Sequence, residues 1–350
     1  MFLAFKEIQR EKTRYGLIIA IIALITFLMF MLTALALGLR NANSAAIRSW
    51  NATSIALSEQ ADDQLSASML AATSVDELLA QTDAATAVGH ATVRVTSSSD
   101  AENLPFLGID PQSFIGENIQ LREGKMLQNP DEVVIDADYA AEHNLSIGDE
   151  IILGENSSYT LAGLAEDASL SVRALVYGDF SQWREVRDLP QDIAASAVLA
   201  QQELKAPAGT TVLAIDDFIR ELPGYSAQNT TFSAMLGTLA IVTLVIIAVF
   251  LYILVLQQLP NIAVLRAQGI PAHFLIRTVI AQAVVMTLAG ILIATVITAI
   301  LAQVIPAGMP TEFSISLLSG LSCGLIVMAI VGAILPARQI SRVDPIRLIG

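Results

Sequence analysis

The stretch that decides the fold is residues 15–39, which read YGLIIAIIALITFLMFMLTALALGL. No charged residue stands between Arg14 and Arg40. Because a helix needs about 20 mainly apolar residues to cross a bilayer, this run predicts a membrane-spanning helix. The alternative is a cleaved signal peptide with Ala34-Leu35-Ala36 as its cleavage site, but the apolar region of such a peptide is only about 7–15 residues long.

Three further apolar runs have the length of a membrane span, at residues 232–256, 274–304 and 315–335. The interiors of the four runs contain no Asp, Glu, Lys or His, and Arg277 stands near the start of the third. Ionisable residues inside a membrane usually mark proton or ion relays. Their absence argues against a proton-driven transporter, so the energy for any transport must come from outside the chain.

The composition separates an apolar frame from an acidic insertion. The 350 residues are 54% hydrophobic and 15% charged, whereas soluble domains carry about 25% charged residues. The formal net charge of −14 argues against a nucleic-acid partner. Residues 41–229 hold 29 acidic and 9 basic residues, a net charge of −20. The sequence therefore predicts an acidic domain inserted between the first and second spans.

Basic residues in short flanking segments predict the orientation, because cytoplasmic loops are enriched in Lys and Arg. These residues are Lys6, Arg10, Lys12, Arg14, Arg266, Arg277, Arg338, Arg342 and Arg347. The N-terminus, residues 257–273 and the tail 336–350 are therefore expected in the cytoplasm. Residues 40–231 and the short loop 305–314 are expected on the outer side of the cell membrane.

Two cytoplasmic segments have helical patterns. In residues 1–14, Phe2, Phe5 and Ile8 recur at helical spacing, which predicts an amphipathic helix at the inner interface, with a frayed polar tail as the alternative. In residues 257–273, Pro260 suits the first turn of a short separate helix, and Gly269 suits its C-terminal stop. A simple connector is the alternative for this second segment.

The inserted domain is expected to be α+β. Alternating apolar residues predict strands at 90–96, 106–109, 132–135, 150–153, 159–164 and 172–177, with helix in part of 54–81 and at 136–145. Residues 216–225 are expected to form the stalk that descends into the second span. His90, His143 and His273 are far apart, and Cys323 is the single cysteine. The sequence thus indicates no catalytic residues, no metal site and no intrinsic cofactor. The pairs Asp62-Asp63 and Asp216-Asp217 are interpreted as solvated charge.

Two strings connect the chain to a family. Residues 261–269 read NIAVLRAQG, which resembles the E-I-x-V-L-R-A-x-G segment of the MacB/FtsX-type ABC transporter permeases, with Asn261 in place of Glu. Residues 336–348 read PARQISRVDPIRL and resemble that family's C-terminal P-A-x-x-A-x-x-x-x-P pattern. The order of one span, a large outer domain and three spans also matches.

The resemblance implies a permease homodimer that works with two copies of a separate ABC ATPase subunit. ATP and Mg would then be bound by that subunit, because this chain has no G-x-x-x-x-G-K-[ST] loop. The 257–273 segment would be the coupling helix that docks on the ATPase. Its expected contact residues are Pro260, Ile262, Leu265, Arg266 and Gly269.

Within the family, the N-terminal string 2–15 and the string LPGYSAQNTTF at 222–232 most resemble the HrtB-type heme exporter permeases of Gram-positive bacteria. Heme is flat, mostly apolar and carries two propionates, and its iron accepts Met, His, Tyr or carboxylate ligands in various proteins. The expected substrate site lies between the first two spans near the outer leaflet. Its candidate residues are Phe30, Met31, Arg40, Glu221, Tyr225 and Met235. The alternative for each is contact with lipid or with neighbouring helices.

Small residues spaced by three allow helices to approach closely in a membrane. Three such pairs are Ala34 with Gly38, Ser233 with Gly237, and Gly320 with Gly324, and the first two are expected at a homodimer contact. Two other functions stay open beside export of heme or a similar amphiphile. One is an FtsX-like mechanotransducer without transport, and the other is an extruder of lipids or lipoproteins.

Overall fold

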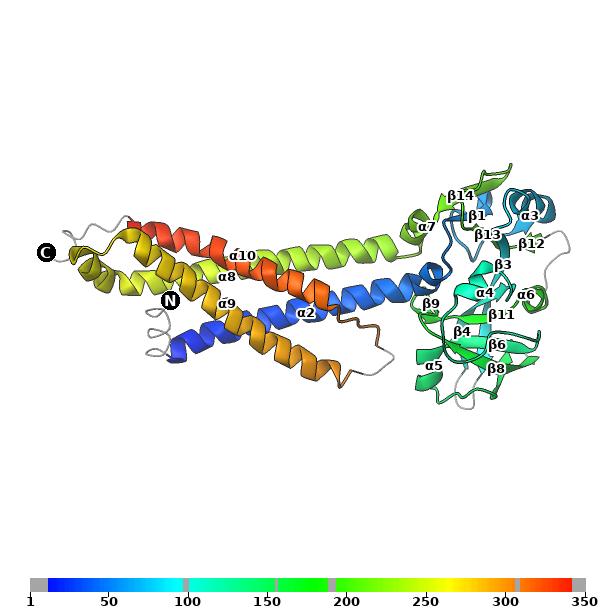
Figure 1. The fold of residues 1–350 in the computed structure, drawn as a ribbon, viewed down its shortest axis with the longest axis horizontal. Coiled ribbons are helices and arrows are strands. Elements are labelled where there is room, and N and C mark those ends of the chain that lie inside the picture. The colour runs from blue at the N-terminus through cyan, green and yellow to red at the C-terminus, as the bar shows by residue number, and fades with distance from the viewer. Residues whose placement is uncertain (1–11, 97–100, 155–156, 188–192, 306–308, 342–350) are drawn as a thin grey trace. The chain divides into compact units, whose positions relative to one another are not determined.

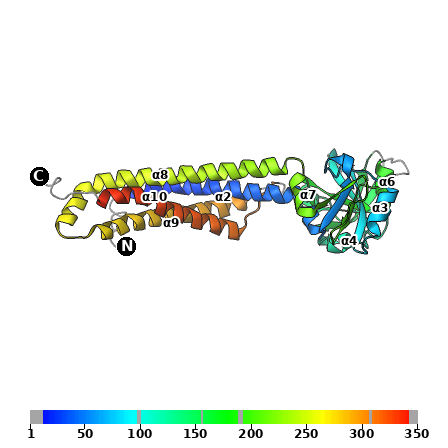
Figure 2. The ribbon, with the colours of Figure 1, turned by 90° about the horizontal axis from the view of Figure 1, so that it is seen from above.

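The computed structural model describes residues 12–96, 101–154, 157–187, 193–305 and 309–341. The expected interfacial helix 1–14 and the expected tail 336–350 therefore lie partly outside the described residues. The chain divides into two units. The membrane unit comprises Met1–Leu37, Thr230–Ile305 and Thr311–Gly350, and the outer unit comprises Gly38–Asn229 and Pro306–Pro310. The elements of both are drawn in Figures 1 and 2.

Four long helices supply the membrane unit: α2 (Lys12–Ser49), α8 (Tyr225–Ala267), α9 (Ala272–Ala302) and α10 (Ile315–Ser341). Each contains an apolar window long enough to cross a membrane, so the four predicted spans are confirmed. Helices suit this environment because they satisfy every interior backbone N–H and C=O within the segment, where lipid offers no partner.

The four helices share one apolar core, to which Ile22, Leu251, Met286 and Ala329 contribute one residue each from α2, α8, α9 and α10. Two of the contacts depend on glycine. A Cβ atom on Gly290 of α9 would lie 2.7 Å from Ile22 Cγ2 and 3.2 Å from Ala23 N of α2. The equivalent atom on Gly332 of α10 would lie 3.4 Å from Leu244 O of α8. Neither glycine belongs to the pairs singled out in the sequence.

The small residues singled out in the sequence differ in how far their surfaces are covered by the rest of the chain. Ala34 is 1% exposed and its carbonyl accepts a hydrogen bond from Glu312 N, at 3.0 Å, so its surface is covered within the chain. No atom lies within 4 Å of a Cβ placed on Gly237, Gly320 or Gly324. The surfaces at these three glycines are therefore open in the single chain.

The outer unit is built on a ten-stranded mixed sheet in the order β14-β1-β13-β3-β4-β11-β6-β8-β5, with β7 pairing with both β3 and β8. Its strands are β1 (Ser54–Ser58), β3 (Ala85–Thr96), β4 (Ala101–Ile109), β5 (Leu121–Gly124), β6 (Glu132–Asp136), β7 (Glu150–Leu153), β8 (Ser157–Ala165), β11 (Val176–Asp179), β13 (Ala197–Ala200) and β14 (Thr210–Ala214). The double pairing of β7 closes β3, β4, β11, β6, β8 and β7 into a ring.

Small sheets and short helices complete the outer unit. They are β2 (Leu70–Ala71) with β12 (Ile193–Ala195), β9 (Ser169–Leu170) with β10 (Arg173–Ala174), η1 (Glu59–Ala61), α3 (Ala72–Leu79), α4 (Phe114–Asn118), α5 (Ala137–Glu142), α6 (Phe180–Arg187) and α7 (Ile215–Glu221). The predicted α+β class of this domain is confirmed.

Successive strand residues point to opposite faces of the sheet and so feed two separate cores. On β6, Val133 and Ile135 join one core while Val134 joins the other. On β11, Val176 and Tyr177 divide in the same way. Both sides of the central strands are therefore apolar, which is why their sequences read as short continuous runs.

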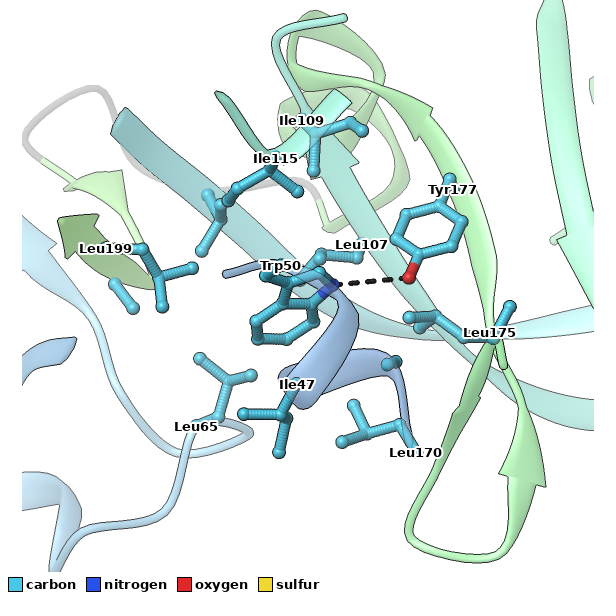
Figure 3. Close-up of a cluster of buried hydrophobic side chains, with 14 of the residues drawn as sticks. Ile47, Trp50, Leu65, Leu107, Ile109, Ile115, Leu170, Leu175, Tyr177 and Leu199 are labelled. Carbon is cyan, nitrogen blue, oxygen red and sulfur yellow. Dashed lines mark hydrogen bonds between the residues drawn. The ribbon is translucent and has the colours of Figure 1, made fainter. Parts of the chain in front are cut away.

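One of the two cores encloses the outer end of α2, around Trp50 (Figure 3). Ile47 and Trp50 are both 0% exposed, and Trp50 Nε1 donates a hydrogen bond to the Tyr177 hydroxyl, at 3.2 Å. Burial raises the pKa of Tyr177, so this hydroxyl stays neutral. Phe218 of α7 and Tyr225 at the start of α8 belong to the same core. The ends of α2 and α8 within the outer unit are thus held by one set of side chains.

Polar contacts fasten the same stretch of α2. Asn43 Nδ2 donates to Gln228 Oε1 of α8, at 3.0 Å. At the tip of the β9–β10 hairpin, the backbone N–H groups of Ser171 and Val172 donate to the carbonyls of Asn43 and Ala42, at 3.1 and 3.0 Å. Val172 has a φ of 63°, a left-handed conformation that is unusual for a β-branched residue. This local strain is retained where the hairpin holds the helix.

One sequence-based expectation for this unit was wrong, and one strand was not predicted. The helix expected in part of 54–81 is α3, whereas Ser54–Ser58 is an unpredicted strand that pairs with both β13 and β14. The strand expected at 172–177 is divided into β10 and β11. The stalk expected at 216–225 consists of α7, which ends at Glu221, and a turn in which Gly224 takes a φ of 80° before α8 begins.

The Trp50 core predicts a large stability effect. Trp50→Ala should destabilise the full-length permease by about 3–5 kcal/mol, since it empties a fully buried site, and Tyr177→Phe by about 1 kcal/mol through the lost hydrogen bond. Unfolding of the detergent-solubilised chain followed by circular dichroism measures both. Met69→Ala, at a side chain 40% exposed, is the matched control and should change little. Equal stability of Trp50→Ala and wild type would contradict this account of the core.

Candidate functional site

The candidate substrate residues of the membrane unit differ in exposure. Phe30 of α2 is 1% exposed and therefore packs inside the chain. Its neighbour Met31 is half-buried, and Met235 of α8 is 46% exposed. Of these three, Met31 and Met235 present surface that a ligand or a second chain can reach in this structure.

The remaining candidates, Arg40, Glu221 and Tyr225, belong to the outer unit. Arg40 and Glu221 are exposed, whereas Tyr225 is 9% exposed and lies in the core around Trp50. Glu221 and Tyr225 flank a tight turn in which Tyr225 N donates to Leu222 O, at 3.0 Å. The structure thus places the six residues in two units, and their shared role in substrate binding stays a prediction.

The outer halves of the first two spans contribute to one apolar cluster in the membrane unit. Ile25 and Met29 of α2 and Leu325 of α10 form this cluster, and Leu239 and Ala240 of α8 pack against it. Met235 is one helical turn from Leu239 on α8. A site bounded by α2 and α8 on this side of the membrane would therefore have Met, Ile and Leu side chains around it.

The cytoplasmic turn between α8 and α9 has a well-defined hydrogen-bonding pattern. Gly269 N donates to Arg266 O, at 3.0 Å, and Ile270 N donates to Leu265 O, at 3.1 Å. Gly269 has a φ of 89°. These features define a Schellman motif, in which a left-handed residue, usually glycine, ends the helix. Leu265 and Ile270 both pack against an apolar cluster of Val255, Leu275 and Val279, as the motif requires.

The predicted helix stop at Gly269 is therefore confirmed, but the separate short helix expected in residues 257–273 was wrong. Residues 260–267 continue α8, which runs unbroken from Tyr225 to Ala267. Pro260 has no backbone N–H, so α8 lacks one hydrogen bond at this position. The helix has 43 residues and continues through the proline because its other backbone bonds remain. The side chains of Pro260 and Ile262 lie outside the described residues. Leu265 and Arg266 are half-buried and Gly269 is exposed.

The outer unit contains a buried histidine, His90, and two exposed ion pairs, which involve Asp216 and Asp217. Burial, and secondarily the charge of Arg187, lower the pKa of His90 to about 4, so this histidine is neutral at pH 7. Asp217 pairs with Arg220, at 2.9 Å, and Asp216 lies 3.9 Å from Arg48. Both carboxylates are exposed, which confirms their interpretation as solvated charge. Within the described residues, no group of three or more His, Cys, Asp or Glu could hold a metal ion.

Comparison with known proteins gives two family matches that together span nearly the whole chain. Residues 15–219 match the MacB-like periplasmic core domain, and residues 233–345 match the FtsX-like permease C-terminal domain. The chain therefore belongs to the MacB/FtsX family of ABC transporter permeases. It is a multi-pass protein of the plasma membrane and a transmembrane subunit, and membership of this family implies an ATPase as its partner.

Similar curated proteins cover the full length of the chain. The hemin transport system permease protein HrtB of Staphylococcus epidermidis is 23% identical over 354 residues, covering 100% of this chain and 99% of that protein. A protein of the same description from Staphylococcus haemolyticus is 21% identical over 357 residues, with the same coverage.

Among solved structures, the extracellular domain of the noncanonic ABC-type transporter YknZ from Gram-positive bacteria covers 46% of this chain and 99% of that chain. Its sequence identity is 12% and its TM-score is 0.36. A domain of a permease protein from Porphyromonas gingivalis covers 46% of this chain and 86% of that chain, with 14% identity and a TM-score of 0.29.

The geometry at Gly269 predicts a specific cost for substitution. Gly269→Ala places a side chain on a left-handed residue, so it should destabilise the purified permease by about 1–2 kcal/mol, visible as a lower midpoint of thermal unfolding. Gly320→Ala is the matched control, because Gly320 lies inside α10 with open space around it. Alanine is the better helix former there, so the control should be neutral or slightly stabilising. Equal midpoints for the two variants would refute the assigned turn.

Proposed function

We propose that this chain is the permease subunit of an efflux pump that removes heme, or a similar amphiphilic compound, from the membrane. The observation that carries the proposal is its end-to-end similarity to permease proteins of hemin transport systems. The half-buried Met31 and the exposed Met235 support it chemically, because a thioether is one of the axial ligands that heme iron accepts.

The spans themselves also favour an amphiphilic substrate. Their interiors carry no Asp, Glu, Lys or His, so four such helices would make a poor path for a hydrophilic solute. Heme has a large apolar face and two propionates. Met31, Met235 and apolar neighbours would contact the ring, while Arg40 is a candidate partner for a propionate, since guanidinium groups bind carboxylates well.

In the proposed mechanism two copies of this chain form a cleft between α2 and α8, open to the outer half of the bilayer. ATP binding brings two partner ATPase subunits together at the cytoplasmic turn that ends at Gly269. Their motion passes into α8 and α9, the cleft narrows, and the substrate leaves on the outer side. The chain has no enzymatic activity of its own in this mechanism, because it lacks a phosphate-binding loop.

Heme titration of the purified permease–ATPase complex tests the substrate. The wild type should bind heme with a shifted Soret band, and Met31→Ala, Met235→Ala and Glu221→Ala should each weaken binding by about tenfold, or about 1.4 kcal/mol. Met328→Ala, at a half-buried methionine of α10, is the control and should bind as the wild type does. A wild type without any spectral change would remove heme as the substrate and leave the permease assignment intact.

A second candidate function is force transmission to an outer partner without transport. It is favoured by the single core that holds the ends of both α2 and α8 in the outer unit. A transmitting permease would show no heme-dependent stimulation of its ATPase, and residues 41–229 would bind the partner. The same titration, read out as ATP hydrolysis, separates the two functions.

A further inference from the structure

The ten-stranded sheet of the outer unit ends in two edge strands, β5 and β14. An edge strand presents a row of backbone N–H and C=O groups to any chain beside it, and proteins usually protect it with charges, bulges or short length. β5 has such protection. It contains four residues, among them Arg122 and Glu123, and its register with β8 shifts between Leu121 and Glu123. This edge is therefore poorly suited to pairing with a further strand.

The opposite edge, β14, carries none of these protections. Its residues Thr210–Ala214 include no charged residue and no proline, and all five pair with Ser54–Ser58 of β1 in a regular register. Among the strands that the structure describes, β1 is the one partner of β14. The strand is therefore an intact sheet edge that can accept a further strand.

Hydrogen bonds just beyond the two ends of the β1–β14 ladder show which backbone groups face outward. Glu59 N donates to Gly209 O, at 3.1 Å, and Ile215 N donates to Thr53 O, at 3.0 Å. Backbone groups alternate in direction along an antiparallel strand, so the odd-numbered residues of β14 point theirs at β1. The N–H and C=O of Val212 therefore face away from β1, where an added antiparallel strand would bond to both.

The side chains at this edge lie at the rims of two apolar cores. Leu213 packs against the core around Trp50. Val212 packs against a different core, which includes Ala56 and Val198. Val212 and Leu213 are both half-buried. A strand added beside β14 would cover more of each side chain, so a fitting strand carries apolar or hydroxyl side chains on both of its faces.

The surroundings of this edge are acidic. Residues 54–63 hold three acidic residues and no basic one, and residues 209–221 hold three acidic residues and one basic one. Glu59 and Asp216, beyond the two ends of the ladder, are exposed, and Arg48 offsets part of the charge of Asp216 at 3.9 Å. The inserted domain as a whole has a net charge of −20. Because like charges oppose association and opposite charges favour it, the edge fits a basic partner better than a second copy of this domain.

We propose that β14 is a docking site for an extended, basic segment of a second extracytoplasmic protein, which adds to the sheet as a further strand. Main-chain hydrogen bonds to Val212 supply affinity in this mode of recognition, and the flanking charges select the partner. The acidic surroundings of β14 would pair with basic residues on either side of the added strand. This interaction goes beyond the proposed function, because it requires neither heme nor nucleotide.

Binding of a fluorescent peptide tests the docking site. The probe is the peptide KTVTVTK, measured by fluorescence anisotropy on the permease–ATPase complex in phosphatidylcholine nanodiscs, with empty nanodiscs as the blank. The acidic counterpart ETVTVTE should bind about tenfold more weakly at low salt, and the difference should shrink as salt is added. A form of KTVTVTK with methylated backbone nitrogens should not bind, because it cannot donate hydrogen bonds to β14.

Val212→Pro is the matching change in the permease. It removes the outward N–H and sets a ring against the incoming strand, so it should raise the Kd of KTVTVTK by about tenfold. Proline is tolerated in an edge strand where the N–H faces solvent, so the thermal midpoint should fall only slightly. Val212→Ile keeps the N–H and is the matched control, which should bind the peptide as the wild type does.

Equal binding of KTVTVTK and its methylated form to the wild type would overturn the proposal, and this comparison does not depend on how well Val212→Pro folds. An unchanged Kd in a folded Val212→Pro would overturn it as well. A wild type that binds no peptide, together with fewer crosslinked permease dimers in Val212→Pro, would show that a second copy of this chain covers β14 instead. Failure of heme binding would leave these results untouched, since the readout contains no heme.

Discussion

The structure depends on one constraint, which is that the bilayer interior offers no hydrogen-bond partner to a peptide group. The backbone N–H and C=O groups of each apolar run must form their hydrogen bonds within that run, so the four runs fold as four helices. Polar segments of the chain are excluded from the spans. The acidic residues are concentrated in 41–229, where water can solvate them. The same exclusion keeps Asp, Glu, Lys and His out of the span interiors, and membership of the ABC permease family implies an ATPase as the partner.

In the outer unit, the ends of α2 and α8 are fixed inside a folded domain. Ile47 in the last turn of α2 and Trp50 just after the helix are both fully buried. The hairpin at Ser171–Val172 holds the carbonyls of Ala42 and Asn43, and Gln228 of α8 bonds to the Asn43 side chain. The helix α2 runs from Lys12 to Ser49, so the apolar run and Ile47 belong to the same element.

The spans, the α+β class and the stop at Gly269 could be predicted from the sequence because each rests on a local signal. Apolar length marks a span, alternation marks a strand, and Gly269 followed by Pro271 marks a helix end. The sequence was less informative where non-local pairing decides the outcome. The helix expected in part of 54–81 is α3, but the strand Ser54–Ser58 was not predicted, because it is defined by its pairing with β13 and β14. The helix α6 was missed although Phe180 and Trp183 stand at helical spacing, because eight residues are too few for the period to stand out.

Side-chain environments were harder to predict than elements. Phe30 and Tyr225 were chosen for their chemistry, yet the structure buries both, Phe30 within the membrane unit and Tyr225 in the Trp50 core. Gly290 and Gly332 make the close helix contacts, whereas the regularly spaced Gly320 and Gly324 face open space. A pattern of residue types along one helix cannot show which face meets a neighbour, because that depends on the rotation of both helices.

The measurement that tests the central claim most directly is ATP hydrolysis by three preparations in lipid: the permease alone, its ATPase subunit alone, and the two together. The account predicts no hydrolysis by the permease alone and a rate for the complex that increases when heme is added. Hydrolysis by the purified permease without a partner would contradict it.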